Sequence, residues 1–331
     1  MIMAQKKQKE RIIPEVLVFT DINNGYYDDL AAMPVLAYLA KTKQIELKGI
    51  ITELGAFETR RRRALYAKGV MSFLNMPFVR VVPGGDYELQ NEAEENIYPE
   101  NEFSHEFEVN GSAILRSGMT FMQEYFKSVK DKKIVILLNA PFPDFAKFLN
   151  ATADVVKKKV KKIVVMGNVL PQKSADGKYM PDINSFNFKF GAPAAETLFE
   201  YAQNNDVRLV LVTPESVKSL NMQTEFSDAL KNSKNPVVKQ LQAAKCESPV
   251  SLQYDMLSAL VVADAEFKKS GGEFAKADAA DKNVFFAKVN DAEAMRNKFC
   301  TIYKDMFVPQ KITLAQLMKK QGDKSDGGSV S

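Results

Sequence analysis

The chain has 331 residues, of which 46% are hydrophobic, and a formal net charge of +4 that results from 45 Lys and Arg against 41 Asp and Glu. This length allows one large or two ordinary domains, and so small a charge excess gives no indication of binding to nucleic acid or to an anionic membrane. The two cysteines, Cys246 and Cys300, and the single histidine, His105, exclude a disulfide framework and a metal centre of several imidazoles, which leaves oxygen ligands for any metal chemistry.

The two ends of the chain are polar. Residues 1–14 are basic and lack the apolar segment of a signal peptide, so we expect a polar N-terminal extension. Residues 321–331 are small and polar, and we expect a disordered tail there. No run reaches the roughly 18 apolar residues of a membrane helix. No repeat or linker divides the sequence between these ends, which predicts one domain over residues 15–320 in a cytoplasmic protein.

Continuous apolar runs alternate with helical patterns along this domain. Helical patterns follow the first two runs, at Asp28–Lys41 and at Arg60–Leu74. Runs of Val, Ile and Leu without alternation are typical of strands that are buried on both faces. The sequence therefore predicts an α/β fold with a doubly wound, mainly parallel sheet that is covered by helices on both faces. The predicted strands are Val16–Thr20, Ile45–Thr52, Phe78–Val82, Lys133–Leu138, Lys162–Met166 and Val207–Thr213.

Ligands of such sheets bind at the carboxyl ends of the strands, so the candidate residues are those that directly follow a strand. The first strand is followed by the segment Asp21–Asp29, which carries three carboxylates and two amides on a loop that contains a glycine. Hard cations such as Ca²⁺ prefer oxygen ligands of this kind. Because Asp and Asn also cap helices and form turns, the simpler structural interpretation stays open for this segment alone.

Three later segments reach the same edge of the predicted sheet. The loop 139–144 contains two prolines and could present a carbonyl to a metal or serve as a rigid turn. A long polar loop leads to residues 184–187, and Gly191–Glu196 then follows as an ordinary helix start. The segment Tyr254–Leu257 begins an apolar helix, where Asp255 could be a helix cap or a ligand that meets the first loop.

Three further patterns have structural interpretations. Arg60–Arg63 is predicted to be a solvated turn of a helix, and Lys157–Lys162 a solvated helix end that leads into a buried strand. The i, i+3 spacing of Phe142, Phe145 and Phe148 predicts residues of the hydrophobic core.

Five short motifs follow the order and spacing of one known family from about Glu15 to Phe307. On these motifs the chain resembles the nucleoside hydrolases, the inosine-uridine-preferring N-ribohydrolases. Each motif is weak alone, but five in order over nearly the whole chain are specific. The family pattern D-x-D-P-G-x-D-D is matched by Asp21–Asp29 with one inserted residue, and G-P-L-T-N is matched by Ala140–Asp144. The pattern V-V-M-G-G is matched by Val164–Asn168, and E-F-N with D-P-E-A-A is matched by Ser185–Asn187 with Ala192–Glu196. The last pattern, H-D-x-L, is matched by Tyr254–Leu257.

The resemblance implies a calcium ion at the base of a nucleoside pocket. Its ligands would be Asn23, Asp29, the carbonyl of Pro143, and Asp255, with Asp28 beside them near the ribose. In the family the ion holds the ribose hydroxyls and the attacking water, and an Asp ligand takes the proton of that water. The resemblance therefore implies hydrolysis of the N-glycosyl bond of purine or pyrimidine nucleosides.

Several positions that contact the ligand in the family carry other residues here. The general base of the family is an Asp where this chain has Asn23, and an amide cannot accept a proton near neutral pH. Asp21 is the candidate replacement base. The substitution also removes a negative charge, so we expect calcium to be bound weakly or not at all. Asn187 is retained, whereas the ribose contacts and the leaving-group acid are replaced by Ala56, Ser185 and Tyr254.

Two functions stay open on these residues. The first is a nucleoside hydrolase-like protein with a degraded site, weakly active or non-catalytic, which binds a nucleoside or ribose-like molecule or serves a structural partner protein. The second is an active, calcium-dependent N-ribosyl hydrolase. A homo-oligomer is implied by the family only, and neither nucleic acid nor a membrane is expected as a partner. The acidic segment Glu92–Glu108, which contains His105, departs from the family pattern and receives no role.

Overall fold

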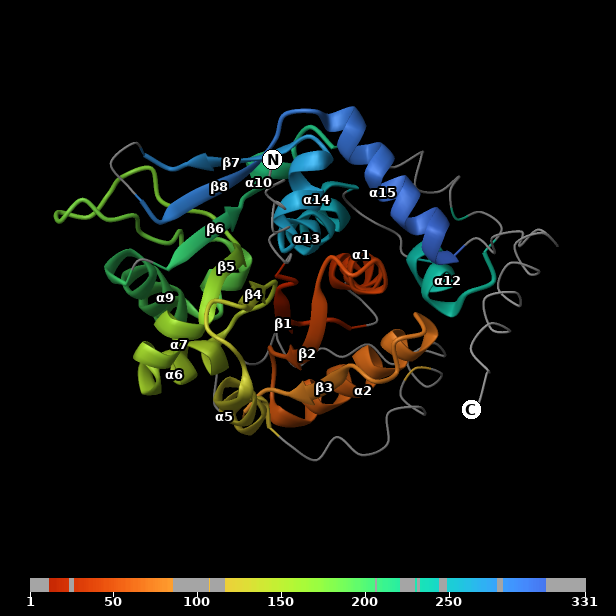
Figure 1. Cartoon of the computed structure of the whole chain (residues 1–331), viewed down its shortest axis with the longest axis horizontal. Helices are drawn as coiled ribbons and strands as arrows, with labels where there is room; N and C mark the ends of the chain where they lie inside the picture. The colour runs from red at the N-terminus through yellow and green to blue at the C-terminus, as the bar shows by residue number, and fades with distance from the viewer. Residues whose placement is uncertain are drawn as a thin grey trace, which may run out of the picture.

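A computed structural model of the chain describes residues 12–23, 27–85, 107, 117–205, 207–220, 230, 233–243, 249–278 and 282–307. Within these residues helices cover both faces of one central sheet, which confirms the predicted α/β class (Figure 1). The expected tail and most of the expected N-terminal extension lie outside the described residues. None of the helices described is both long and apolar enough to cross a membrane.

The sheet formed by these residues has eight strands in the order β3-β2-β1-β4-β5-β6-β8-β7. Every neighbouring pair is parallel except β7 and β8, which are antiparallel. The six predicted strands are confirmed, whereas β7 and β8 were not predicted because neither is fully buried. The strands are β1 (Glu15–Thr20), β2 (Glu46–Thr52), β3 (Arg80–Pro83), β4 (Ile134–Leu138), β5 (Val160–Met166), β6 (Arg208–Val212), β7 (Gly272–Lys276) and β8 (Val284–Val289).

Two hydrophobic cores lie on the two faces of the sheet. Successive side chains of a strand point to opposite faces, so Val16 and Val18 of β1 belong to one core, and Leu17 and Phe19 to the other. The first core includes α1 (Asp28–Lys41), α2 (Phe57–Phe73), α10 (Pro214–Val217), α12 (Pro236–Ala243), α13 (Pro249–Val261), α14 (Asp264–Lys269) and α15 (Ala292–Phe307). The second includes α5 (Gly118–Ser128), α6 (Pro143–Ala151), α7 (Ala153–Lys159), α8 (Phe186–Lys189) and α9 (Ala192–Asn204), and it contains the predicted core residues Phe142, Phe145 and Phe148.

Two runs of basic residues are less solvated than predicted. On α2, Arg60 and Arg63 are 0% and 1% exposed, so the prediction of a solvated turn is wrong for them. Arg61 remains on the outside and pairs with Glu58. The reason is geometric: residues three apart share one helix face, and this face of α2 points into the protein.

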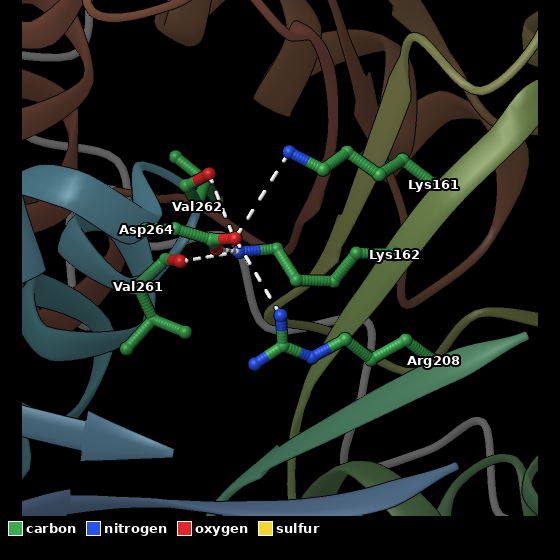
Figure 2. Close-up of polar contacts among 6 residues, drawn as sticks. All are labelled: Lys161, Lys162, Arg208, Val261, Val262 and Asp264. Atoms are coloured by element: carbon green, nitrogen blue, oxygen red, sulfur yellow. Dashed lines mark hydrogen bonds and ion pairs between the residues drawn. The ribbon is translucent and has the colours of Figure 1, made fainter. Parts of the chain in front are cut away.

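The second run ends in a buried lysine near the amino end of β5. Lys162 is 1% exposed, and its Nζ donates to the carbonyl of Val261 at 2.7 Å, at the C-terminal end of α13. Figure 2 shows Lys162 and Arg208 pointing from neighbouring strands toward Asp264, with which both form ion pairs. Burial lowers the pKa of Lys162 to about 8, although Asp264 opposes the shift. The prediction of a solvated run is therefore wrong at its last residue.

The lowered pKa of Lys162 predicts how stability depends on pH. Between pH 8 and 10.5 the unfolded chain binds a proton that the folded protein has released, so the free energy of unfolding rises with pH in this window. At 1.36 kcal/mol per pKa unit, we expect a rise of about 3 kcal/mol. Urea unfolding of the unsubstituted protein and of Lys162→Met at several pH values isolates this contribution, because it is lost only in the variant.

The matched control is Lys161→Met, since Lys161 is the neighbouring residue on β5 and lies 4.0 Å from the same Asp264 carboxylate. We expect Lys161→Met to keep the pH dependence of the unsubstituted protein. Identical pH curves for the unsubstituted protein and Lys162→Met would contradict the assignment.

Candidate functional site

Three carboxylates meet where the N-terminus of α1 packs against α13. Oxygen atoms of Asp28, Asp29 and Asp255 all lie within 4.8 Å of one another. Asp28 and Asp29 begin α1, directly after the loop that follows β1. Asp255 lies inside α13, which begins at Pro249, so the prediction that it stands at a helix start is wrong. The fold thus brings together residues more than 220 positions apart in the sequence.

The carboxylates of this cluster are buried next to like charges. Burial, followed by the repulsion from Asp21, raises the pKa of Asp28 to about 6. Burial also raises the pKa of Asp29 well above its usual value, with Asp255 as the next cause. The pKa of Asp255 is raised by burial and then by Asp28 and Asp21. Asp21 therefore lies close enough to act on all three carboxylates.

The hydrogen bonds available to the cluster are few. The Thr20 hydroxyl donates to Asp29 Oδ1, and the Asp29 amide donates to Asp28 Oδ1 at 3.1 Å. Asp255 is 0% exposed, yet among the described residues no donor reaches either of its carboxylate oxygens. A buried carboxylate without a donor is stable when it is protonated or when a positive charge lies beside it.

The donor set fits one hard cation. Calcium takes oxygen ligands at 2.3–2.6 Å, so oxygens on opposite sides of one ion lie about 4.6–5.2 Å apart. The spread of 4.8 Å in the cluster is compatible with this. Asp29 and Asp255 are among the predicted ligands, and Asp28, which was expected beside them, joins the same group.

The two other predicted ligands lie at the same edge of the sheet. Asn23 follows β1, is 0% exposed, and its Nδ2 lies 3.5 Å from the carbonyl oxygen of Asp21. Pro143 is the first residue of α6, which follows β4, the neighbour of β1 in the sheet. Their role as ligands stays a prediction.

A network of buried amides connects the cluster to the ends of β4 and β5. Asn187 Nδ2 donates to the carbonyls of Asn139 and Met166 at 3.1 and 3.3 Å. Ser258 Oγ lies 2.7 Å from Asn139 Oδ1 and 2.8 Å from the carbonyl oxygen of Asp255. Asn187 was predicted at the site, whereas Asn139 and Ser258 were not singled out. The signal for Asn139 was its place immediately after β4.

The remaining predicted site residues are found at the same edge with local partners. Ser185 Oγ donates to the carbonyl of Asp182 at 2.7 Å. Ala56 caps α2, where its carbonyl accepts the Arg60 amide at 3.0 Å. Burial and the adjacent Asp255 raise the pKa of Tyr254 above that of an ordinary phenol. Asn24, His105 and most of the segment 92–108 lie outside the described residues.

Two further buried acidic residues, Glu53 and Asp144, lie in candidate segments after strands, but the sequence analysis assigned their carboxylates no role. Asp144 Oδ2 accepts the Gly85 amide at 2.5 Å, and a Cβ atom on Gly84 would lie 2.8 Å from Glu53 Oε2 and 3.0 Å from Asp144 Oδ2. Burial raises the pKa of Asp144, although Arg60 opposes this shift. Glu53 follows β2 directly, and Asp144 is the second residue of α6, at the end of the loop that follows β4, so their places after strands were the available signal.

Comparisons with known proteins agree with this fold. The sequence model of the family described as inosine-uridine preferring nucleoside hydrolase matches residues 16–312. No curated protein matches the sequence. The solved structure of the type III effector protein XopQ complexed with adenosine diphosphate ribose has a TM-score of 0.79 at 21% identity, and covers 90% of this chain and 96% of its own.

Two further solved structures share the fold. The effector protein XOO4466 has a TM-score of 0.76 at 20% identity, with coverage of 90% of this chain and 95% of its own. An inosine-uridine preferring nucleoside hydrolase from Bacillus anthracis has a TM-score of 0.62 at 14% identity, with coverage of 88% and 100%. At these identities the structural likeness shows a common fold and leaves activity to the residues of the site.

The cluster predicts the effect of removing one charge. In the presence of a chelator at pH 7, Asp255→Asn is expected to raise the free energy of unfolding by roughly 1–3 kcal/mol, because a neutral amide relieves the repulsion that raises the carboxyl pKa values. Added Ca²⁺ is expected to stabilise the unsubstituted protein more than the variant. Thermal unfolding with chelator and with Ca²⁺ measures both effects.

Asp154→Asn serves as the control, since Asp154 is an exposed carboxylate on α7. We expect this variant to follow the unsubstituted protein in both conditions. A chelated Asp255→Asn protein that is less stable than the unsubstituted one would contradict the repulsion argument.

Proposed function

The chain belongs to the inosine-uridine preferring nucleoside hydrolase family, and on that premise we propose that it is a nucleoside hydrolase-like protein that binds a cation and a ribose-containing ligand but hydrolyses nucleosides weakly or not at all. The observation that carries the proposal is the buried amide of Asn23 at the start of the site loop. A neutral amide can offer an oxygen to a cation, but it cannot take a proton from water near pH 7.

The retained carboxylates support cation binding. Asp28, Asp29 and Asp255 would hold Ca²⁺, with the Asn23 side-chain oxygen and the Pro143 carbonyl at the remaining family positions. When bound, Ca²⁺ fixes ribose hydroxyls and lowers the pKa of a bound water. Thr20 keeps Asp29 oriented by its hydrogen bond. Three charged ligands for a cation are therefore retained, although the neutral Asn23 lowers the negative charge of the site.

The groups that would move protons are weakened. Asn23 cannot accept a proton from the attacking water. Tyr254 stands where the family has a His for the leaving base, and its raised pKa makes it a still poorer acid than an ordinary phenol. Loss of one positioned acid or base typically lowers the rate by about 10²–10⁴. Both losses favour ligand binding over turnover.

The proposed ligand contains a ribose that can carry a phosphate. XopQ, which shares the fold, binds adenosine diphosphate ribose. In this chain the family's 5′-hydroxyl contact, a Glu, is replaced by Ser185, whose hydroxyl is engaged with the carbonyl of Asp182. Without the Glu charge, a phosphate at the 5′ position meets less repulsion. We therefore extend the proposed ligand class from nucleosides to ADP-ribose-like molecules.

A second candidate is an active, calcium-dependent hydrolase of purine or pyrimidine nucleosides with Asp21 as the base. The observation in its favour is electrostatic: Asp21 raises the pKa of Asp28, Asp29 and Asp255, so its carboxylate lies near the place where an attacking water would be held. Asp21 can accept a proton where Asn23 cannot.

Our proposal also covers the location of the protein and its assembly. Two cysteines and no disulfide framework suit a reducing compartment, so we propose a cytoplasmic location. A homo-oligomer, or a complex with a structural partner protein, is proposed from the family alone.

Restoring the lost base tests the proposed function. Asn23→Asp is expected to raise kcat/KM for inosine or uridine by about 10²–10⁴ in the presence of Ca²⁺, because a positioned base contributes on that scale. Release of ribose is measured for the unsubstituted protein and for the variant, with and without chelator. Asp21→Asn is assayed beside them.

Clear calcium-dependent turnover by the unsubstituted protein would overturn the proposal of weak catalysis. Its loss in Asp21→Asn would then establish the second candidate. As the matched control for an added carboxylate, Asn205→Asp lies at the C-terminal end of α9, outside the carboxylate cluster, and is expected to leave turnover unchanged.

The phosphate-tolerant ligand class has its own test. Ser185→Glu is expected to weaken the binding of ADP-ribose by about tenfold and to leave inosine binding within a factor of three, because only the phosphates are repelled by the new charge. Ser185→Gln has the same size without the charge and is expected to affect both ligands equally. Calorimetric titrations of the unsubstituted protein and both variants measure the six affinities, and equal losses of ADP-ribose affinity in both variants would contradict the charge argument.

A further inference from the structure

Two buried arginines on α2 hold the backbone of two turns at the carboxyl edge of the sheet. Arg63 Nη1 donates to the carbonyl of Asp21, the first residue after β1. Arg60 Nη1 donates to the carbonyl of Gly85, which follows β3. Both side chains are buried, whereas Arg61 on the same helix is 43% exposed. Helix α2 thus contacts the turn after β1 and the turn after β3 through two guanidinium groups.

A buried guanidinium is costly, so its partners indicate what it stabilises. The group stays charged at every physiological pH and loses its hydration on burial. Its planar fork donates in fixed directions, which makes it suited to fixing a carbonyl in place. In the case of Arg63 the fixed carbonyl belongs to the peptide that begins the site loop.

The Asp21 peptide lies between the strand and the cluster. Its carbonyl oxygen is also 3.5 Å from Asn23 Nδ2, so Arg63 and Asn23 converge on the same atom. The Asp21 side chain acts electrostatically on the three carboxylates of the cluster. A shift of this one peptide would move both Asp21 and Asn23 relative to Asp29 and Asp255.

We propose that Arg63 is a positioning residue for the cation site, in that its buried guanidinium fixes the Asp21 peptide and thereby the places of the Asp21 and Asn23 side chains. This inference rests on the cation site of the proposed function. Arg63 donates to the backbone carbonyl of Asp21, and it would act on the cation site through this peptide. It belongs to the outer shell that orients the groups around a metal.

Arg60 provides the matched comparison for this role. It is as buried as Arg63, lies one helical turn away, and also donates to a backbone carbonyl, but that carbonyl belongs to Gly85. A general loss of stability should therefore appear in variants of either arginine. A change in the cation site should appear only in variants of Arg63.

The test compares Arg63→Met, Arg63→Lys, Arg60→Met and the exposed Arg61→Met by calorimetric titration with Ca²⁺ and by thermal unfolding. Loss of an outer-shell partner typically lowers metal affinity by about 10–100-fold, and we expect this for Arg63→Met. Arg63→Lys keeps the positive charge and an N–H donor, and should recover part of the Ca²⁺ affinity. Arg60→Met and Arg61→Met should keep the affinity of the unsubstituted protein within about threefold.

Two results would overturn the role of Arg63. One is an unchanged Ca²⁺ affinity in Arg63→Met. The other is an equal loss of affinity in Arg63→Met and Arg60→Met that follows their loss of stability. If Arg63→Met does not fold, the comparison of Arg63→Lys with Arg60→Met decides in the same way.

Hydrogen exchange separates this inference from the cation site itself. If the unsubstituted protein binds no Ca²⁺, the cation site of the proposed function is wrong. The peptide that covers Thr20–Asn23 still reports on Arg63: its exchange should accelerate in Arg63→Met and stay unchanged in Arg60→Met, where the effect should fall on Gly85. Unchanged exchange at Thr20–Asn23 in Arg63→Met would overturn the positioning role whatever the cation does.

Discussion

Burial of Asp29 and Asp255 beside each other sets a condition that the surrounding structure has to meet. Two ionised carboxylates repel strongly where water does not screen them, and burial raises the pKa of both. A hydrogen bond from the Thr20 hydroxyl stabilises the carboxylate of Asp29, whereas no donor among the described residues reaches the carboxylate of Asp255. A cation between α1 and α13 would satisfy this condition. If the proposed cation binds there, its binding and the packing of these two helices would depend on each other.

In the proposed function, the same condition would let the site keep its ligand and lose its chemistry. A cation needs oxygen ligands with negative charge, and three carboxylates still supply them. Hydrolysis needs a group that accepts a proton, and the buried Asn23 cannot do so. The fold is shared with a nucleoside hydrolase and with two effector proteins. One fold can host different activities, so the residues of the site decide the activity. The exchange of one carboxylate for an amide is therefore a stronger argument about activity than the shared fold.

Helix α13 meets charged side chains at two places, with carboxylates at one and a lysine at the other. Asp255 faces the carboxylate cluster, and the carbonyl of Val261 accepts a hydrogen bond from Lys162 (Figure 2). With a rise of about 1.5 Å per residue, these two positions are roughly 9 Å apart along the helix. A cation at the end of a helix interacts favourably with its dipole. The hydrogen bond from Lys162 thus connects the C-terminal end of α13 to β5, in the same helix that carries Asp255.

Local pattern determined the architecture: continuous apolar runs predicted six strands, and α1 begins and ends where its pattern does. The order of carboxylates and amides after β1 also indicated the site. Tertiary structure alone decided that Asp255 lies within α13, that Asp28 joins the cluster, and that the buried carboxylates of Glu53 and Asp144 both lie near Gly84. It also decided that Arg60, Arg63 and Lys162 are buried. Sequence periodicity indicates which residues share a face of a helix or strand. A long cationic side chain, however, is buried only if the fold brings a carbonyl or carboxylate within its reach. That partner lies far away in the sequence, so the local pattern does not identify it.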